Sequence, residues 1–233
     1  MAKLQWKAGT LLAPVPAVLV TCGVRNGKGA ESTDYGVNNG KGAESTVCGE
    51  KNEKGAEKNG RTESARDNVF TVAWTGIVNT QPPMLTLSVR KERFSHALIS
   101  ESGEFAVNLV SEKLVRAADF CGVKSGREID KFDACGLTRE RANAVGCPLI
   151  AESPLSLECR VRSVTPLGSH DLFLAEILCA DVQEELVDGA GKLHLESAGL
   201  AAYAHGEYFA LGRKLGSFGF SVRKKKKAGR KSH

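Results

Sequence analysis

Apolar and polar residues alternate along much of the chain with a period of two, which is the pattern of strands that bury one face. The alternation is strict over 155–163, and it recurs over 84–90 and 104–110. A long apolar stretch over 171–182 follows a glycine-containing turn and predicts a further strand. Many short strands separated by glycine turns, with few helical segments, predict a mainly β fold with a closed or sandwiched antiparallel sheet.

Only two short helices are expected. Apolar side chains have helical spacing over 92–100, and Gly103 ends that helix. Ser111 is a candidate N-cap for the second helix.

A long polar segment interrupts a predicted hairpin. Residues 17–22 and 67–74 are predicted strands that would pair if 24–66 were a short turn. Within 24–66 the words NGKGAE, NGKGAE and NEKGAE start at 26, 39 and 52, and the segment has no Ile, Leu, Phe, Trp or Met. Such a segment buries too little apolar area to offset its ordering entropy. We therefore predict one domain over 1–222 with a flexible insertion at 24–66.

Composition and charge indicate a globular body with a basic tail. The 233 residues are 42% hydrophobic and 25% charged, which is ordinary for a globular protein. The net charge of +5 comes from 223–233, RKKKKAGRKSH, which contains seven cations and no acid. Because like-charge runs are usually solvated, we expect a disordered tail and no nucleic-acid partner. A salt-sensitive contact with an acidic surface or nucleic acid is the alternative.

Seven cysteines are scattered along the chain with no C-x-x-C spacing. This pattern excludes the common zinc-knuckle spacings and argues against a disulfide framework, so no metal site is expected. Reduced cysteines suit a cytoplasmic protein. The apolar run near the N-terminus is interrupted by Pro14 and Pro16 and is shorter than the ~20 residues of a membrane span, so no membrane association is expected.

Arg90 and Arg93 stand where a predicted strand ends and a predicted helix begins. Helix N-termini attract anions through their free N–H groups, and arginine makes bidentate phosphate contacts. With Ser95 two residues further on, this segment is a candidate phosphate clamp; the alternative is a solvated turn.

Residues 69–80 combine strand-forming residues with small hydroxyl residues. On one continuous strand Thr71 and Thr75 would share a face, with Val72 and Trp74 on the other. The edge of such a strand suits a flat polar ring, and ordinary core packing is the alternative.

The stretch DFCGVKSGREIDKF at 119–132 is too polar for a core helix. Gly122 and Gly126 allow a tight loop that approaches a ligand closely. Cys121 is either a nucleophile or, more commonly for this residue type, a buried thiol. Three side chains could meet ligand oxygens, although the last could equally pair with a neighbouring aspartate: Ser125, Arg127 and Lys131.

An imidazole, a carboxylate and a phenol come together in sequence at 205–208. They form a candidate proton relay, with ordinary structural roles as the alternative.

The order of these sequence motifs along the chain resembles that of one known family, the flavin reductase-like FMN-binding split barrels, and specifically of its flavoredoxin branch. The matching words are TVAWTGIVNTQPP at 71–83, SVRKERFSHALI at 88–99, ESGEFAVNL at 101–109, DFCGVKSGREIDKF at 119–132, LGSHDLFLAEI at 167–177 and HGEYFALGRKLGSFGFSVRKK at 205–225. The resemblance implies an antiparallel six-stranded barrel of Greek-key type, a homodimer and FMN as the cofactor.

The resemblance also implies which residues hold FMN. The isoalloxazine ring would lie along Thr71, Val72, Ala73 and Trp74. The ribityl phosphate end would be held by Ser88, Val89, Arg90, Arg93, Ser95 and His96. Asn108 is a further expected contact. A loop closing over FMN, within one chain or across the dimer interface, would contribute Cys121, Gly122, Ser125 and Lys131.

By this resemblance the chain is expected to be an oxidoreductase that moves electrons through bound FMN, with NAD(P)H or a redox protein as the donor. No G-x-G-x-x-G follows a predicted strand, so no separate dinucleotide domain is indicated. Three alternatives stay open: an FMN electron carrier without its own NAD(P)H turnover, a non-enzymatic binding protein acting through the basic tail, and a flavin-free structural descendant.

Overall fold

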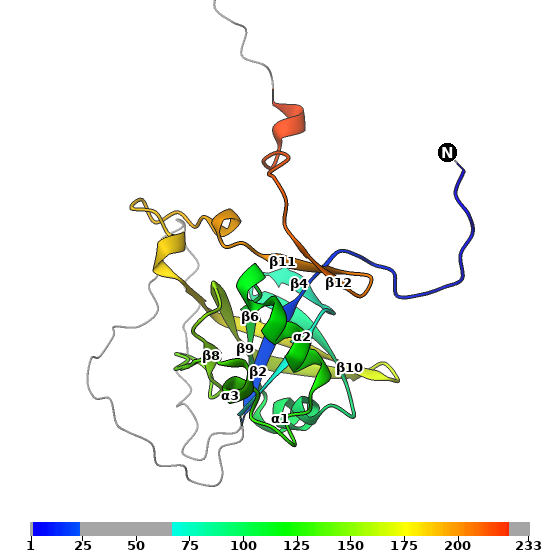
Figure 1. The fold of residues 1–233 in the computed structure, drawn as a ribbon, viewed down its shortest axis with the longest axis vertical. Helices are drawn as coiled ribbons and strands as arrows, with labels where there is room; N and C mark the ends of the chain where they lie inside the picture. Colours follow the sequence, from blue (N-terminus) through cyan, green and yellow to red (C-terminus); the bar gives the residue numbers. More distant parts are fainter. Residues whose placement is uncertain (1, 24–66, 224–233) are drawn as a thin grey trace, which may run out of the picture.

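The alternating segments form one seven-stranded antiparallel sheet in the computed structural model, which describes residues 2–23 and 67–223 (Figure 1). The repeat segment 24–66 and the tail after Arg223 lie outside the described residues, and so do the predictions made for them. The strand order is β3 (Asp67–Val72), β2 (Val18–Gly23), β6 (Glu104–Leu109), β9 (Leu155–Pro166), β10 (His170–Val182), β5 (Pro83–Arg90) and β4 (Thr75–Thr80).

The sheet closes on itself at Ala73 and Trp74. These two residues join β3 to β4, which occupy opposite edges of the sheet. A two-residue link reaches only about 10 Å, so the sheet has to curl until its edges meet. At the junction the Ser88 N–H of β5 donates to the Trp74 carbonyl at 3.0 Å. The mainly β barrel predicted from the sequence is confirmed.

The strands on either side of 24–66 pair as predicted. β2 and β3 are antiparallel, with Val18 opposite Val72 and Gly23 opposite Asp67. By contrast, the prediction that Thr71 and Thr75 share one face of a strand is wrong, because the chain turns at Ala73 and Trp74 to reach the other edge. Thr71 and Thr75 therefore lie on different strands. The main sheet has seven strands in the described residues, which is compatible with the expected six-stranded barrel.

Two smaller sheets and three helices complete the fold. A three-stranded sheet combines β1 (Val15–Pro16), β11 (Ala201–Ala204) and β12 (Glu207–Ala210), and a two-stranded sheet combines β7 (Arg139–Glu140) and β8 (Leu149–Ile150). The helices are α1 (Phe94–Ser102), α2 (Val115–Val123) and α3 (Lys131–Cys135). Short 3₁₀ turns are η1 (Glu112–Leu114), η2 (Glu184–Leu186), η3 (Leu195–Ser197) and η4 (Phe220–Val222).

Helix α1 ends as the sequence predicts. Gly103 has a φ of 68° and its N–H donates to the Ile99 carbonyl at 2.9 Å, the geometry in which glycine is favoured. Ser111 does precede a helical segment, η1, but its side chain makes no capping hydrogen bond.

Both faces of β2 are buried, which explains its unbroken apolar run. One face points into the barrel, where Val20 belongs to the same core as Phe105 and Phe173. The other face carries Leu19, which packs in a second core with Phe132 and residues of α2 and α3. The helices are thus held against the outside of β2 and β3.

The stretch 119–132 is not one loop, contrary to the prediction. Its first residues complete α2 and its last residues begin α3. Ala118 and Cys121 of α2 face the core and are fully buried, while Asp119 between them is exposed. A short helix with a narrow apolar face has too few apolar residues to be distinguished from a loop by composition.

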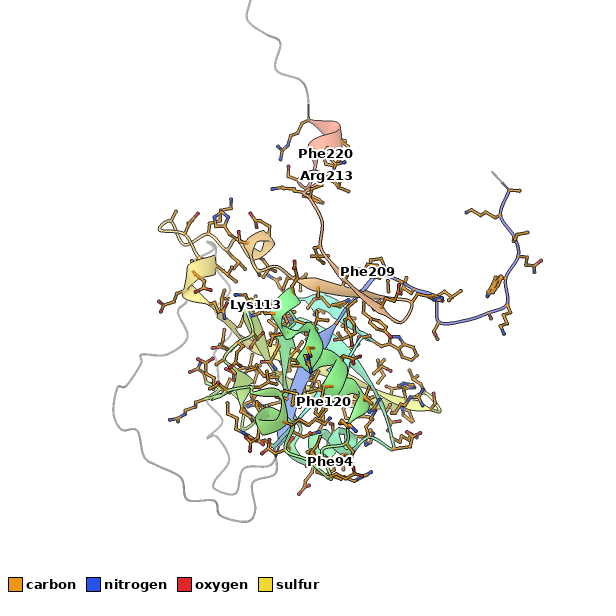
Figure 2. The ribbon with its side chains drawn as sticks, viewed as in Figure 1. Phe94, Lys113, Phe120, Phe209, Arg213 and Phe220 are labelled. Carbon is orange, nitrogen blue, oxygen red and sulfur yellow. The ribbon has the colours of Figure 1, made fainter. Side chains whose placement is uncertain are left out.

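Both ends of the described chain extend away from the barrel (Figure 1). Trp6 near the N-terminus is 73% exposed, and Phe218 and Phe220 on the C-terminal arm are also exposed; Figure 2 shows Arg213 and Phe220 on this arm. None of the helices in the described ranges is long and apolar enough to cross a membrane.

Candidate functional site

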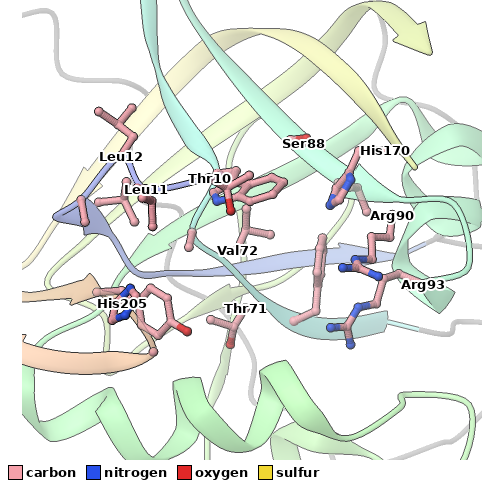
Figure 3. Close-up of a pocket in the computed structure, with 18 residues that line it drawn as sticks. Thr10, Leu11, Leu12, Thr71, Val72, Ser88, Arg90, Arg93, His170 and His205 are labelled. Atoms are coloured by element: carbon pink, nitrogen blue, oxygen red, sulfur yellow. The ribbon is translucent and has the colours of Figure 1, made fainter. Parts of the chain in front are cut away.

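A cleft of about 770 Å³ opens where the barrel closes. Its walls come from the end of β3 and the link to β4, from β5 and the turn after it, and from the small sheet with residues 10–13 before it (Figure 3). The volume lies within the ~300–1,000 Å³ that is usual for small-molecule sites. The closure of the barrel therefore brings distant segments of the chain to one cavity.

One wall of the cleft is the free edge of β3. β3 is an edge strand of the seven-stranded sheet, and edge strands leave alternate N–H and C=O groups unpaired. Residues 70–74 line the cleft, so this edge offers hydrogen-bonding groups to the rim of a flat ligand. The Thr71 hydroxyl donates to the Ala118 carbonyl of α2, which holds the strand end against the helix.

Aromatic rings form another part of the wall. The ring centroids of Trp74 and His170 are 4.9 Å apart and the planes are tilted by 38°. Both residues line the cleft, and Trp74 is 45% exposed. Flat polarizable rings of this kind stack on aromatic ligands. The exposed face of Trp74 leaves this part of the cleft open to solvent.

Two arginines stand at one end of the cleft and His205 at the other (Figure 3). Arg93 Nη1 donates to the Gly122 carbonyl of α2 at 2.9 Å. This contact fixes the guanidinium while leaving its other donors for a ligand. Arg90 is exposed at the end of β5.

A smaller pocket of about 230 Å³ adjoins the cleft, and Phe70 and Arg93 line both. It lies at the N-terminus of α1, where Arg93 occupies the N-cap position and Ser95 is buried in the first turn. Free N–H groups and the helix dipole favour an anion at this place. Lys124, Arg127 and Lys131 add positive charge to the same pocket.

Lys131 is only 4% exposed. Its Nζ donates to the Cys121 carbonyl at 2.9 Å, which uses one of the three donors of an ammonium group. Burial lowers the pKa of Lys131, because desolvation disfavours the charged form. A bound phosphate would favour the charged form, so this donor set fits a phosphate group.

Asn68 and Gly126 set the width of the smaller pocket. Asn68 Nδ2 donates to Ser95 Oγ at 2.7 Å. A Cβ on Gly126 would lie 2.1 Å from Asn68 Oδ1, so only glycine allows the chain to pass so close. The close neighbour of Gly126 in the described chain is Asn68, and the predicted close approach to a ligand stays a prediction.

Most of the predicted site residues meet at these two pockets, and they do so within a single chain. The larger cleft is lined by Thr71, Val72, Ala73, Trp74, Ser88, Val89, Arg90 and Arg93. The smaller pocket is lined by Arg93, Ser95, Ser125 and Lys131.

Asn108 lies outside both pockets, so its predicted contact with the cofactor is not supported. It is fully buried, and its Nδ2 donates to the Leu19 carbonyl at 3.0 Å. Its Oδ1 accepts from the Ile150 N–H at 3.0 Å and from Ser156 Oγ at 2.7 Å. The amide is already used within the fold and joins β2, β6 and β9.

His96 also lies outside both pockets. Its Nε2 is 2.8 Å from Asp171 Oδ2, and Lys91 Nζ is 3.3 Å from Asp171 Oδ1. Burial opposes ionisation of Asp171, but hydrogen bonds from His96 and Lys91 outweigh it and lower the pKa of Asp171. His96 therefore ties α1 to the start of β10.

Cys121 and Gly122 act through their backbone rather than as direct contacts. Neither lines either pocket. The Cys121 carbonyl holds Lys131 and the Gly122 carbonyl holds Arg93. The two residues thus position both cations, and the Cys121 side chain is the buried thiol that the sequence analysis offered as the alternative.

Several cleft residues were not among the predicted contacts: Thr10, Leu11, Leu12, Ala13, Tyr203 and His170. Nothing in their local sequence distinguishes them from surface or core residues. His205 also lines the cleft, whereas Glu207 and Tyr208 do not, so the predicted relay is not assembled. His205 has a φ of 52° and Gly206 a φ of 91°, and this His-Gly pair forms the two-residue hairpin between β11 and β12.

Comparison with known proteins agrees with this geometry. A family model for the flavin reductase like domain matches residues 55–212. The flavoredoxin of Desulfovibrio vulgaris (Miyazaki F) is similar in structure, with a TM-score of 0.73 and 25% identity over 95% of this chain and 100% of that chain.

Two relatives are similar in sequence. An uncharacterized protein of Aeropyrum pernix is 39% identical over 105 residues, which is 45% of this chain and 40% of that protein. An NADPH-flavin oxidoreductase of Streptomyces viridifaciens is 30% identical over 128 residues, which is 53% of this chain and 65% of that protein. The match therefore spans less than half the length of the Aeropyrum protein.

The family model covers more than half of the chain, and the split-barrel fold is shared with a flavoredoxin over nearly its whole length. The chain therefore belongs to the flavin reductase-like family, in its flavoredoxin branch.

Proposed function

We propose that this chain is an FMN-binding oxidoreductase of the flavin reductase and flavoredoxin type. The observation that carries the proposal is the junction of two pockets at Phe70 and Arg93. One pocket is an open cleft with aromatic walls, and the other is a small cationic pocket at a helix N-terminus. A flat ring that carries a phosphate on a flexible arm needs this combination.

In this proposal the isoalloxazine ring lies along 71–74, with its polar rim toward the free edge of β3. The ribityl arm passes Arg93, and the phosphate enters the smaller pocket beside Lys131 and Ser95. Charge-assisted hydrogen bonds to phosphate are the strongest polar contacts available there. The small volume of this pocket, about 230 Å³, favours a mononucleotide over a dinucleotide.

Bound FMN would supply hydride acceptance and electron release, while the protein supplies binding and orientation. The residues of this chain hold the ring edge, keep one ring face open beside Trp74 and place a cation, Arg90, at the cleft. An exposed cation at this position suits an anionic donor such as NAD(P)H. The 30% identity to an NADPH-flavin oxidoreductase supports the same donor class.

The direct test is the visible spectrum of the purified full chain with and without added FMN, followed by NADH or NADPH without oxygen. We expect a yellow complex that bleaches on addition of the reductant. A protein that stays colourless with excess FMN refutes the proposal.

A second candidate function is electron transfer through FMN without direct turnover of NAD(P)H. The similarity to a flavoredoxin favours it. It predicts a yellow complex that NADH and NADPH leave unbleached and that a reduced electron-transfer protein bleaches. The same titration therefore separates the two candidates.

We also propose that the chain is a cytoplasmic homodimer. The exposed apolar side chains of Trp6, Phe218 and Phe220 lie on the extended ends, and exposed apolar surface of this kind marks interaction sites. The six cysteines of the described residues are all thiols, which suits a reducing compartment.

The dimer is tested by sedimentation of the full chain and of a double variant, Phe218→Ser with Phe220→Ser. The control is Val164→Ser, which removes an exposed apolar side chain from β9. A wild-type chain that sediments as a monomer at micromolar concentration rules out the dimer. If the extended arms form the interface, the double variant should dissociate into monomers and the control variant should not.

A further inference from the structure

Two cysteines on neighbouring helices lie close together. Cys121 Sγ is 3.8 Å from Cys135 Sγ. Cys121 belongs to α2 and Cys135 is the last residue of α3. A disulfide has an S–S distance of about 2.05 Å, so the two sulfur atoms need to approach by roughly 1.8 Å to bond.

The two thiols have different surroundings. Cys121 is fully buried, and burial, reinforced by the neighbouring Cys135, raises the pKa of Cys121 to about 12. Cys135 is half-buried and lines a groove of about 850 Å³ between α2 and α3. Phe120, labelled in Figure 2, lines the same groove. A small oxidant from solvent therefore reaches Cys135 first.

The groove is lined by Lys113, Arg116 and Lys124 and by the carboxylates Asp119 and Glu152, besides Cys135. The thiolate is the reactive form of cysteine, and a sulfur that lines a groove can reach it more readily than a buried one. The pair thus combines an accessible sulfur with a buried sulfur 3.8 Å away.

We propose that Cys121 and Cys135 form an oxidation site that hydrogen peroxide converts to a disulfide. The Cys135 thiolate attacks peroxide, the O–O bond breaks, and the leaving hydroxide takes up the proton that the Cys135 thiol released on ionisation, so the products are a sulfenic acid and one water. The Cys121 sulfur then displaces the hydroxyl group of the sulfenic acid, which leaves with the Cys121 proton as a second water. Two thiols and one peroxide give one disulfide and two waters, and no flavin takes part.

The disulfide would act on the smaller pocket through two carbonyl groups. The Cys121 carbonyl holds Lys131, the first residue of α3, and the Gly122 carbonyl holds Arg93. An approach of α2 and α3 changes both contacts. Loss of one such hydrogen bond corresponds to roughly tenfold weaker binding of an anion in that pocket. This consequence, unlike the disulfide itself, rests on the proposed FMN site.

The experiment treats the reduced full chain with hydrogen peroxide, blocks remaining thiols with N-ethylmaleimide and digests with trypsin without reductant. Cleavage after Arg116, Lys124, Lys131 and Arg139 places the two cysteines in separate peptides, 117–124 and 132–139. We expect these two peptides to be joined. Cys179→Ser, which changes another half-buried cysteine, is the matched control and should keep the cross-link.

Two variants test the order of the steps. In Cys121→Ser the sulfenic acid cannot be resolved, so dimedone should label Cys135. In Cys135→Ser the buried Cys121 should remain unlabelled. Absence of the cross-link in the wild type, or equal dimedone labelling of wild type and Cys121→Ser, would overturn the proposal.

FMN titration of the reduced and oxidised wild type tests the consequence separately. A roughly tenfold rise in Kd on oxidation supports the coupling, and equal Kd values overturn it. A cross-linked protein that binds no FMN in either state refutes the proposed function and leaves the disulfide site established.

Discussion

Substitution of Gly126 by alanine tests how tightly the smaller pocket is built. A Cβ at this position would lie 2.1 Å from Asn68 Oδ1 and 2.6 Å from Asn68 Cγ. Asn68 is 4% exposed, and its Nδ2 donates to Ser95 Oγ at 2.7 Å. The added methyl group therefore has to displace a buried, hydrogen-bonded side chain that lines the pocket.

The cost has two parts. Overpacking of a well-packed region costs about 1–3 kcal/mol, and a buried polar group that loses its partner costs about 1–3 kcal/mol. We expect Gly126→Ala to lower the free energy of unfolding by about 2–4 kcal/mol. The affinity for FMN should fall as well, because Asn68 would be displaced from its hydrogen bond with Ser95, and both residues line the proposed phosphate pocket.

The matched control is Gly122→Ala in the same segment. A Cβ on Gly122 would meet Thr71 Cβ at 3.4 Å, an ordinary contact, and Gly122 is helical. Because alanine is favoured over glycine in helices by roughly 0.5–1 kcal/mol, this variant should be neutral or stabilised. Urea unfolding and FMN titration of both variants give the comparison. Equal stability of Gly126→Ala and wild type would refute the packing argument.

Three further predictions concern charge and backbone conformation. Arg93→Ala removes the cation shared by both pockets and should weaken FMN binding by about 1.5–3 kcal/mol; unchanged affinity in a fluorescence titration would exclude Arg93 from the site. Burial, together with Glu158, raises the pKa of Asp181 to about 6, above its unfolded value of about 3.9. The contribution of the Asp181 carboxyl group to folding stability is therefore present below pH ~4 and is lost as the pH rises through about 6. Asp181→Asn should therefore be more stable than wild type at pH 7 by about 1 kcal/mol, after allowance for partial exposure, and equal to it at pH 4 in urea unfolding; the same gain at both pH values would contradict this. His205→Gly removes a side chain from a residue with φ 52° and should raise the melting temperature by the equivalent of about 1 kcal/mol, whereas Gly206→Ala, at φ 91°, should lower it; equal shifts in both variants would contradict the strain argument.

The alternation of apolar and polar residues was a reliable guide to the strands. It predicted β5, β6 and β9, while a long apolar stretch predicted β10 and the strands predicted on either side of the repeat segment pair as β2 and β3. The pattern failed to show that Thr71 and Thr75 lie on different strands, because apolar residues do not reveal that the chain leaves one sheet edge for the other at Ala73 and Trp74. It also failed at 119–132, where α2 needs only a narrow apolar face.

For the site, local sequence was sufficient where several chemical groups are adjacent in the chain. Arg90, Arg93 and Ser95 stand at a strand-to-helix junction, and the dipole argument predicts an anion there. Asn108 and His96 show the limit of such reasoning. Both have side chains suited to a cofactor, yet their hydrogen bonds are used inside the fold, and only the packing reveals this.

The sequence by itself determined the fold class, the pairing across 24–66 and the chemistry of the candidate site, because strand periodicity and the grouping of cations with glycines are local properties. The tertiary structure decided which residues share a cavity. Curling of the sheet brings β3 to β5, and the small sheet and the segment before it supply His205 and residues 10–13. Helix α2 holds Arg93 and Lys131 by its carbonyl groups. These contacts join residues far apart in the chain, and they depend on closure of the barrel, which no local pattern contains.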